Sequence, residues 1–378
     1  MQLIPTLADL VALPSISSVD PSLDRSNRPV AEYLAPRLED MGFHCELQPV
    51  TGDKVNLVAT LGSGPGGLVL SGHTDTVPFD AGRWQSDPFT LTETDGRLVG
   101  LGSSDMKGFF AVALQAIEEL MPLQVTEPLI VLATADEETS MSGARALAAS
   151  GQPRARYAVI GEPTNLKPVH MHKGVMMESV RLVGRSGHSS NPALGASALD
   201  AMHKVLGALM TLREQWGKRY NNPGFDVAVP TLNLASMHGG DAPNRICGHC
   251  ELRFDVRMLP GMQSDEVRAV IRQTVSDVLA QDAVRPEFES LIEAVDAFAQ
   301  SRDSELVKLA EQLSGYQATS AAFATEAPFL QAMGMQTVVL GPGSIDCAHQ
   351  PNEYIDTRQL KPAIKLLKRL IQHYCCEP

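Results

Sequence analysis

Three apolar segments of the sequence have the pattern of buried β-strands, and each runs directly into side chains that bind metals or transfer protons. A buried strand does not end in charged groups without a use for them. Because ligands bind beyond the carboxyl ends of strands in open α/β sheets, we expect these groups to share one edge of a sheet. They are His73 and Asp75 after 68–71, Glu137 and Glu138 after 128–134, and Glu162 after 157–160.

Each of these residues also has an ordinary explanation. A single histidine after a strand is commonly a core or surface residue, and a glutamate pair before a helix is favoured by the helix dipole. The segment 161–163, Gly-Glu-Pro, is also an ordinary turn. These explanations are independent of one another, so their coincidence on successive strand ends favours a shared site.

Two further residues extend this set toward a metal site. Asp105 follows the glycine-rich segment 100–104 and precedes a helix predicted from Lys107, so it could cap that helix or bridge two cations with its two oxygens. His349 lies in the irregular segment 341–351. Histidine and carboxylate ligands suit zinc or a similar first-row ion.

The spacing within two motifs separates ligands from supporting groups. Residues two apart in an extended chain point to the same side, so Asp75 is expected to accept a hydrogen bond from the second ring nitrogen of His73. The adjacent Glu137 and Glu138 point in different directions. One of them is therefore expected to bind metal while the other stays available as a base.

The elements that must position these residues alternate between strands and helices. This alternation predicts a mostly parallel sheet covered by helices, which is an α/β catalytic domain. Strands are predicted at 43–50, 55–61, 68–71, 128–134, 157–160 and 337–340, and helices within 1–14 and at 29–41, 107–120, 142–149, 303–313 and 358–373.

The middle of the chain has a different pattern. Its order is strand–helix–strand–strand–helix, which is typical of a small α+β sandwich. We therefore predict a discontinuous catalytic domain, 1–173 and 288–378, interrupted by an inserted α+β domain at 174–287. The strands are predicted at 175–183, 227–237 and 251–258, and the helices at 196–212 and 264–279.

Length and composition limit the classes of function. A chain of 378 residues is long for one compact domain, which favours two. The formal net charge of -13 argues against nucleic acid, because phosphate contacts need clustered Lys and Arg. No apolar run approaches the roughly 20 residues that span a bilayer, and the N-terminal segment lacks the pattern of a signal peptide. We therefore expect a cytoplasmic protein with no nucleic-acid or membrane partner.

Other short motifs lack the context that their functions need. Cys247 and Cys250 form a single CxxC pair, which favours buried or strand-edge thiols over a zinc or redox site. Segment 62–67 matches GxGxxG but precedes a strand, so a turn explains it better than dinucleotide binding. No GxSxG elbow occurs, so a serine nucleophile of the α/β-hydrolase type has no support.

The order of the acidic motifs resembles that of the M20 metallopeptidase family, a family of co-catalytic zinc amidohydrolases. Segment 73–78 is similar to the family's HxDxVP motif, and segments 102–108, 135–138 and 161–164 are similar to its next three motifs. The similarity runs in order over essentially the whole chain. Leu101 stands where the family commonly has arginine, and because that position is not a ligand the metal assignment is unaffected.

This resemblance implies roles for the acidic and histidine residues. Two Zn²⁺ or Co²⁺ ions per subunit are expected, with Asp105 bridging them. Asp75 would orient His73, and Glu137 would be the general acid/base. The expected ligands are His73 and Glu162 for one ion, and Glu138 and His349 for the other.

The resemblance also implies roles for the inserted domain. Segment 184–190 is similar to the family's small-domain histidine motif, whose histidine, His188 here, would reach a partner subunit's active site and stabilise the oxyanion. A solvated loop histidine is the alternative. Arg257 is expected to bind the substrate carboxylate with its planar guanidinium, and Asn244 matches another substrate-side position. A homodimer is therefore expected, with the inserted domain serving as its dimerisation domain.

Within the family, segments 325–328 and 340–353 are most similar to the branch that deacetylates N-acetylornithine. The expected reaction converts N2-acetyl-L-ornithine to L-ornithine and acetate, a step of arginine biosynthesis. Glu326 would face the cationic side chain of that substrate, unless it is simply a helix-start glutamate. The alternatives are a succinyl-diaminopimelate desuccinylase, another N-acyl-amino-acid deacylase or carboxypeptidase, and a catalytically silent metal-binding protein.

Overall fold

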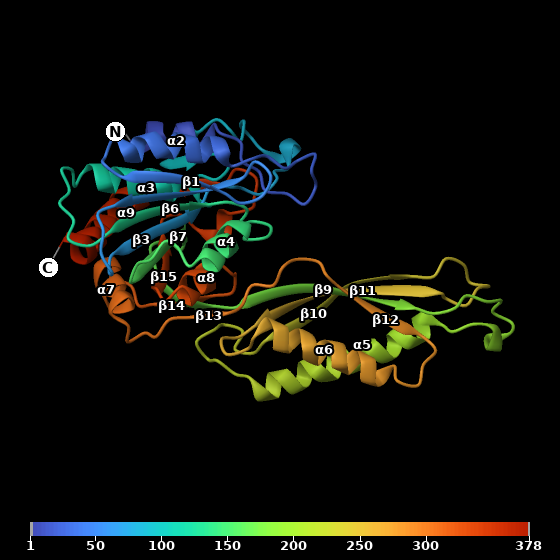
Figure 1. Ribbon diagram of the computed structural model, residues 1–378. Helices are drawn as coiled ribbons and strands as arrows, with labels where there is room; N and C mark the ends of the chain where they lie inside the picture. Colours follow the sequence, from blue (N-terminus) through green and yellow to red (C-terminus); the bar gives the residue numbers. More distant parts are fainter. Residues whose placement is uncertain (1–2, 377–378) are drawn as a thin grey trace. The chain divides into compact units, whose positions relative to one another are not determined.

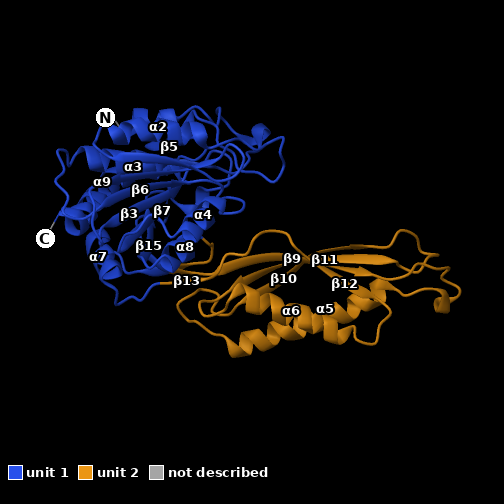
Figure 2. Ribbon diagram, in the orientation of Figure 1, with its two compact units in different colours: residues 1–170, 300–319, 325–378 blue, residues 171–299, 320–324 orange. Residues whose placement is uncertain are grey.

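A computed structural model describes residues 3–376, and the chain divides into two compact units (Figure 2). Unit 1 comprises 1–170, 300–319 and 325–378, and unit 2 comprises 171–299 and 320–324. The inserted domain predicted at 174–287 lies inside unit 2, which extends further at both ends and includes the separate segment 320–324. Residues 1, 2, 377 and 378 of the predicted catalytic domain lie outside the described residues.

The centre of unit 1 is a mixed β-sheet (Figure 1). In order across the sheet, its strands are β1 (His44–Pro49), β2 (Val55–Leu61), β6 (Leu129–Thr134), β3 (Leu68–His73), β7 (Tyr157–Pro163), β15 (Gln336–Gly341) and β8 (Val169–His172). The neighbours β6, β3, β7 and β15 run parallel, and the flanking pairs are antiparallel. The predicted α/β fold is confirmed, with its parallel strands at the centre of the sheet.

The antiparallel flank has a local cause. β1 and β2 are joined by the short segment 50–54, and two strands joined this closely form a hairpin, whereas a parallel pair needs a crossover of a dozen or more residues. Of the parallel strands, β3 and β6 are each followed by a longer segment that contains a helix, whereas β7 is joined to β8 by the short segment 164–168. The acidic motifs lie at or just after the carboxyl ends of β3, β6 and β7, which share one edge of the sheet.

Both faces of the central strands are buried. Leu68 and Leu70 of β3 belong to one hydrophobic core cluster, and Val69 between them points to the opposite face, where it is also buried. Strands covered on both faces appear in a sequence as continuous apolar runs. This is why the central strands could be recognised from the sequence.

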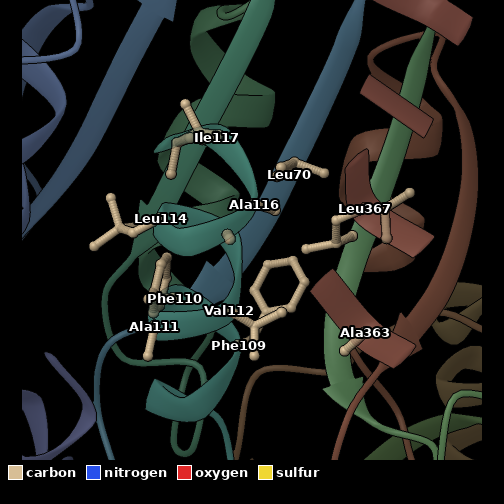
Figure 3. Close-up of a cluster of buried hydrophobic side chains, with 14 of the residues drawn as sticks. Leu70, Phe109, Phe110, Ala111, Val112, Leu114, Ala116, Ile117, Ala363 and Leu367 are labelled. Carbon is tan, nitrogen blue, oxygen red and sulfur yellow. The ribbon is translucent and has the colours of Figure 1, made fainter. Parts of the chain in front are cut away.

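Helices cover the sheet of unit 1. Those that share one core cluster are α1 (Leu3–Val11), α2 (Arg28–Glu39), α3 (Lys107–Glu118), α7 (Glu305–Ser314) and α9 (Thr357–Ile371). α3 is apolar on nearly all sides and buried along most of its length. Figure 3 shows its Phe109 in this cluster with Leu70 of β3 and Leu367 of α9. The remaining pair, α4 (Ser142–Ser150) and α8 (Ala327–Ala332), pack against each other.

A small antiparallel sheet in unit 1 joins two distant parts of the chain. Its strands are β16 (Tyr354–Asp356), β5 (Arg97–Val99) and β4 (Thr92–Thr94), in that order. Tyr354 pairs with Val99, so the segment after His349 lies beside the segment that leads to Asp105. The sequence did not predict these strands, because three residues are too few to show a period.

Unit 2 is an antiparallel sheet with helices on one face (Figure 1). In order its strands are β10 (Thr231–Gly239), β11 (His249–Met258), β9 (Gly174–Val183) and β12 (Arg285–Ser290). Helices α5 (Ala198–Arg219) and α6 (Ser264–Val278) complete a separate hydrophobic core. Edge strand β12 was not predicted, because its sequence is largely polar and none of its residues is fully buried.

Short elements complete the described chain. They are η1 (Ala81–Arg83), η2 (Pro192–Leu194), η3 (Ile345–Cys347), the π-helical turn η4 (Gln372–Cys376), and strands β13 (Phe298–Ala299) and β14 (Thr319–Ala321), which pair with β8. Between residues 3 and 376, no helix combines the length and the apolar character that a membrane crossing requires.

Candidate active site

The ends of three adjacent parallel strands bring the predicted residues together in unit 1. β3 lies between β6 and β7, and its last residue, His73, pairs with Thr134 at the end of β6. Glu162 lies near the end of β7, and the tandem glutamates follow β6 after two intervening residues. The expected meeting of these motifs at one edge of the sheet is therefore found.

A first group of metal-binding side chains consists of His73, Asp105 and Glu162. All three are almost completely buried. The Nε2 atom of His73 lies 3.0 Å from Oδ1 of Asp105 and 3.9 Å from Oε1 of Glu162. One nitrogen and two carboxylate oxygens therefore converge on one point, as a first-row cation requires.

A second group consists of Asp105, Glu138 and His349. The Nε2 atom of His349 lies 3.0 Å from Oε2 of Glu138 and 3.4 Å from Oδ2 of Asp105. Asp105 thus belongs to both groups, with Oδ1 toward the first and Oδ2 toward the second. The two groups contain the residues that the sequence resemblance assigned to each ion, with Asp105 in both, and their role as ligands stays a prediction.

The charges of the two groups fit bound cations. Burial and the nearby carboxylate of Asp105 raise the pKa of Glu162 well above its ordinary value. Hydrogen bonds with Asp105 and Glu138 raise the pKa of His349 to about 10, so a proton on this imidazole balances part of the negative charge. Divalent cations would balance that charge instead, and the imidazoles would then bind as neutral ligands. The donor set suits zinc or a similar ion.

Glycine is required immediately before Glu162. A Cβ atom on Gly161 would overlap the ring of Phe109, which is fixed in the buried helix α3. Helix and strand therefore approach each other at van der Waals distance here. The glycine of this motif serves the packing that holds Glu162 in place.

Glu137 belongs to neither metal-binding group, although it adjoins Glu138. It is partly buried. Burial raises the pKa of Glu137 well above its ordinary value, and the carboxylates of Glu162 and Glu138 add to this rise while His73 opposes it. A carboxyl group beside the ligands, but with no ligand role of its own, is suited to moving protons.

Asp75 differs from its prediction. The ring Nδ1 of His73 lies 3.0 Å from the main-chain oxygen of Asp75, whereas the Asp75 carboxylate is 3.8 Å from that nitrogen. The carboxylate instead accepts hydrogen bonds from the main-chain N–H groups of Glu137 and Glu138, at 3.2 and 3.1 Å. Asp75 therefore orients His73 through its backbone and the tandem glutamates through its side chain.

Comparison with known proteins identifies the family of this chain. Residues 69–373 match peptidase family M20/M25/M40. The chain is 48% identical to an acetylornithine deacetylase of Pectobacterium carotovorum and 49% identical to one of Edwardsiella ictaluri, in both cases over 97% of this chain and 96% of the relative. The chain belongs to the M20 family.

Solved structures of low sequence identity share this fold. The aminopeptidase PepT of Bacillus cereus has a TM-score of 0.77 at 19% identity, covering 98% of this chain and 97% of its own. A dinuclear metal-binding M20 peptidase of Bacillus subtilis has a TM-score of 0.68 at 14% identity, covering 98% of each chain. With its family established, the chain is a metal-dependent hydrolase of amide bonds, and its predicted family is confirmed.

His188, which the resemblance predicted as the histidine of the inserted domain, lies in unit 2 and is exposed. Its Nδ1 accepts a hydrogen bond from the main-chain N–H of Ser190 at 3.2 Å. The hydroxyl oxygen of Ser190 also lies 2.7 Å from Nδ1, so Ser190 contacts this ring nitrogen with both its main chain and its side chain. Asn244 lies close by, since its main-chain oxygen accepts from Ser189. The two predicted residues thus lie on neighbouring loops of unit 2.

Arg257 lies on β11 of unit 2, partly buried. Its Nε donates to Oδ1 of Asp255 at 3.0 Å, and the two residues lie on the same side of the strand. This pairing fixes one edge of the guanidinium. Burial lowers the pKa of the neighbouring Lys173, and the positive charge of Arg257 lowers it further.

Glu326 is the residue before α8 and is 1% exposed. Its side chain makes no capping hydrogen bond, and its Oε1 has no hydrogen-bond partner within the described chain. Burial raises the pKa of Glu326 to about 7, an effect that a hydrogen bond with Thr134 and the charge of His73 oppose. Its carboxyl group therefore lies within electrostatic range of the metal-binding groups.

Two buried acidic residues support the centre without having been predicted. Asp136 has φ of +58°. It accepts a hydrogen bond from Ser17 at 2.8 Å and forms an ion pair with Lys54, and these contacts hold the turn before the tandem glutamates. Glu353 accepts hydrogen bonds from the loop that carries Asp105. The only indication of Glu353 in the sequence is its position four residues after His349.

Proposed function

We propose that this chain is a two-metal deacetylase that hydrolyses N2-acetyl-L-ornithine to L-ornithine and acetate, a step of arginine biosynthesis. The observation that carries the chemistry is the pair of metal-binding groups sharing Asp105, with Glu137 beside them. The substrate is proposed from the relatives named acetylornithine deacetylase, which align with nearly the whole chain. We further propose zinc or cobalt as the native ions and the cytoplasm as the location.

The proposed ligands are the residues of the two groups. When bound, two divalent cations would polarise the scissile carbonyl and lower the pKa of a shared water. The chain supplies the remaining steps. The Glu137 carboxylate takes one proton from water as the hydroxyl oxygen bonds to the acetyl carbon. It then delivers that proton to the leaving nitrogen as the C–N bond breaks.

Unit 2 is proposed as the dimerisation unit of a homodimer. His188 would then complete the active site of the partner subunit, where its Nε2–H would donate to the oxyanion. The contacts of Ser190 with Nδ1 support this role, because they engage one ring nitrogen and leave the contact with the oxyanion to Nε2. The exposure of His188 in the single chain agrees with a partner-directed function.

Mixing two inactive variants tests this borrowing. Glu137→Ala and His188→Ala proteins are expected to complement each other, because each hybrid dimer has one site with both residues intact. Equal mixing with random exchange should restore about a quarter of the wild-type activity. Each variant mixed with itself is the control. Absence of recovery after verified subunit exchange would show that His188 acts within its own chain or not at all.

Three side chains are proposed to bind the substrate in addition to the metal ions. Arg257 would bind the α-carboxylate, with its guanidinium held in plane by Asp255. Asn244 is proposed as a further substrate-side residue. Glu326 would pair with the distal ammonium group of ornithine, which would satisfy its unpartnered buried oxygen.

A substrate panel tests the proposed specificity. The wild-type protein should have a higher kcat/KM for N2-acetylornithine than for N-acetylmethionine or N-succinyl-diaminopimelate. Glu326→Gln should lower kcat/KM for N2-acetylornithine by about 30- to 1,000-fold, because a closed charge pair contributes about 2–4 kcal/mol. N-acetylmethionine, which has no side-chain cation, should be affected far less.

Two results of this panel would redirect the proposal. An equal loss on both acetylated substrates would show that Glu326 supports the fold or the chemistry and not the recognition of the cation. Preference for the succinylated substrate would favour the desuccinylase, whose acyl carboxylate needs further cationic partners.

A further inference from the structure

We propose that Glu353 is a positioning residue of the metal centre, which fixes the bridging Asp105 in relation to His349. This inference rests on the proposed two-metal function, because it concerns how the ligands of that centre are held. Glu353 lies four residues after His349 in the chain and 248 residues after Asp105. Its side chain contacts the main chain of Asp105 and none of the metal-binding side chains, so its effect would be exerted through the backbone.

The Glu353 carboxylate binds the Asp105 loop by three main-chain hydrogen bonds. Oε1 accepts from the N–H groups of Ser104 at 2.8 Å and of Asp105 at 2.9 Å, and Oε2 accepts from Gly102 at 3.0 Å. Glu353 is 2% exposed, so water does not compete for these bonds. The backbone of the bridging ligand is therefore held directly by this one side chain.

The main chain of Glu353 is fixed to the same region. Its oxygen accepts from Gly100 at 3.0 Å, and the next residue, Tyr354, pairs with Val99 in the small sheet. Side chain and backbone together attach Glu353 to residues 99–105. The two chain segments that meet here are the ones that supply Asp105 and His349 to the second metal-binding group.

The loop between His349 and Glu353 needs such an anchor. His349 has φ of +58° and Asn352 has φ of +63°, a region that residues other than glycine seldom adopt. Backbone of this kind persists when surrounding contacts hold it. The side chain of His349 is about half exposed, at 51%, so packing around the imidazole restrains it only in part. Glu353 is the first buried residue on its C-terminal side.

A carboxylate is specifically suited to this task. Its two oxygens accept hydrogen bonds and donate none, which matches three converging N–H groups. Glutamine has the same shape, but its NH₂ group would face at least one of these donors, whichever way the amide is turned. Aspartate keeps the charge and both acceptors, but its side chain is one methylene shorter. The two substitutions therefore separate the hydrogen-bond requirement from the requirement for reach.

Metal affinity measures the role of Glu353 without reference to turnover. Metal-free wild type, Glu353→Gln and Glu353→Asp proteins are titrated with Zn²⁺ in competition with a chelating dye. Glu353→Gln should bind the ion of the Asp105, Glu138 and His349 group about 10- to 100-fold more weakly than wild type, which is the usual effect of removing a partner that orients metal ligands. The zinc affinity of Glu353→Asp should lie between those of wild type and Glu353→Gln.

Glu178→Gln is the matched control. Glu178 is also buried and accepts hydrogen bonds from Arg268 and Ser290, but it belongs to unit 2 and contacts no metal ligand. This variant should lose thermal stability and keep wild-type zinc affinity. A loss of affinity in Glu353→Gln no larger than that in Glu178→Gln would overturn the inference. If Glu353→Gln does not fold, Glu353→Asp is held to the same criterion.

The titration also separates this inference from the proposed function. If wild type binds fewer than two zinc ions, the proposed two-metal centre is contradicted. If wild type binds two ions and Glu353→Gln binds both of them as tightly as wild type does, only the positioning role of Glu353 is contradicted.

Discussion

Glu137→Ala is expected to lower kcat for N2-acetylornithine by about 10²–10⁴ while the metal content stays near that of wild type. The rate falls because no other side chain is assigned to carry the proton from water to the leaving nitrogen. The metal stays because Glu137 belongs to neither ligand group. Steady-state kinetics and metal analysis of the same protein sample measure both effects.

Glu138→Ala is the matched control for this experiment. Glu138 is the neighbouring carboxylate, it is also anchored by Asp75 through its main-chain N–H, and it approaches His349 to 3.0 Å. Its loss should therefore release metal as well as lower the rate. The reverse outcome, with metal lost in Glu137→Ala and kept in Glu138→Ala, would show that the two roles are exchanged.

The parts of this protein that could be predicted from sequence are those whose residues carry a period or a fixed position. Central strands such as β3 are apolar on both faces, and His73 and Glu162 mark the ends of their strands. Parallel neighbours end at one edge, so the meeting of these ligands followed from strand order. The pairing of ligands between two ions came from the family resemblance, since no spacing rule links His349 to Glu138.

The parts that escaped prediction depend on contacts between distant segments. Glu353 acts on Asp105 because β16 pairs with β5, and strands of three residues leave no pattern in a sequence. For Asp75, the two-residue spacing identified its neighbour His73 but not the main-chain N–H groups of Glu137 and Glu138 that its carboxylate binds. Hydrogen bonds to backbone carry no residue signature, so only the structure reveals them.

Removal of the metal is expected to have the largest effect on the rate of hydrolysis, because the proposed chemistry depends on cations held by five side chains. Exhaustive chelation should abolish hydrolysis of N2-acetylornithine, since Glu137 alone cannot polarise the acetyl carbonyl. The fold should survive chelation, because both units have hydrophobic cores that include none of the ligands. Circular dichroism of the metal-free protein serves as the control for folding.

The most direct test of the two-metal deacetylase is therefore a titration of metal-free protein with zinc, in which ornithine release is followed against bound ions per chain. We expect no turnover without metal and full activity at about two ions per chain. Full activity toward N2-acetylornithine in protein shown to be metal-free would contradict the account.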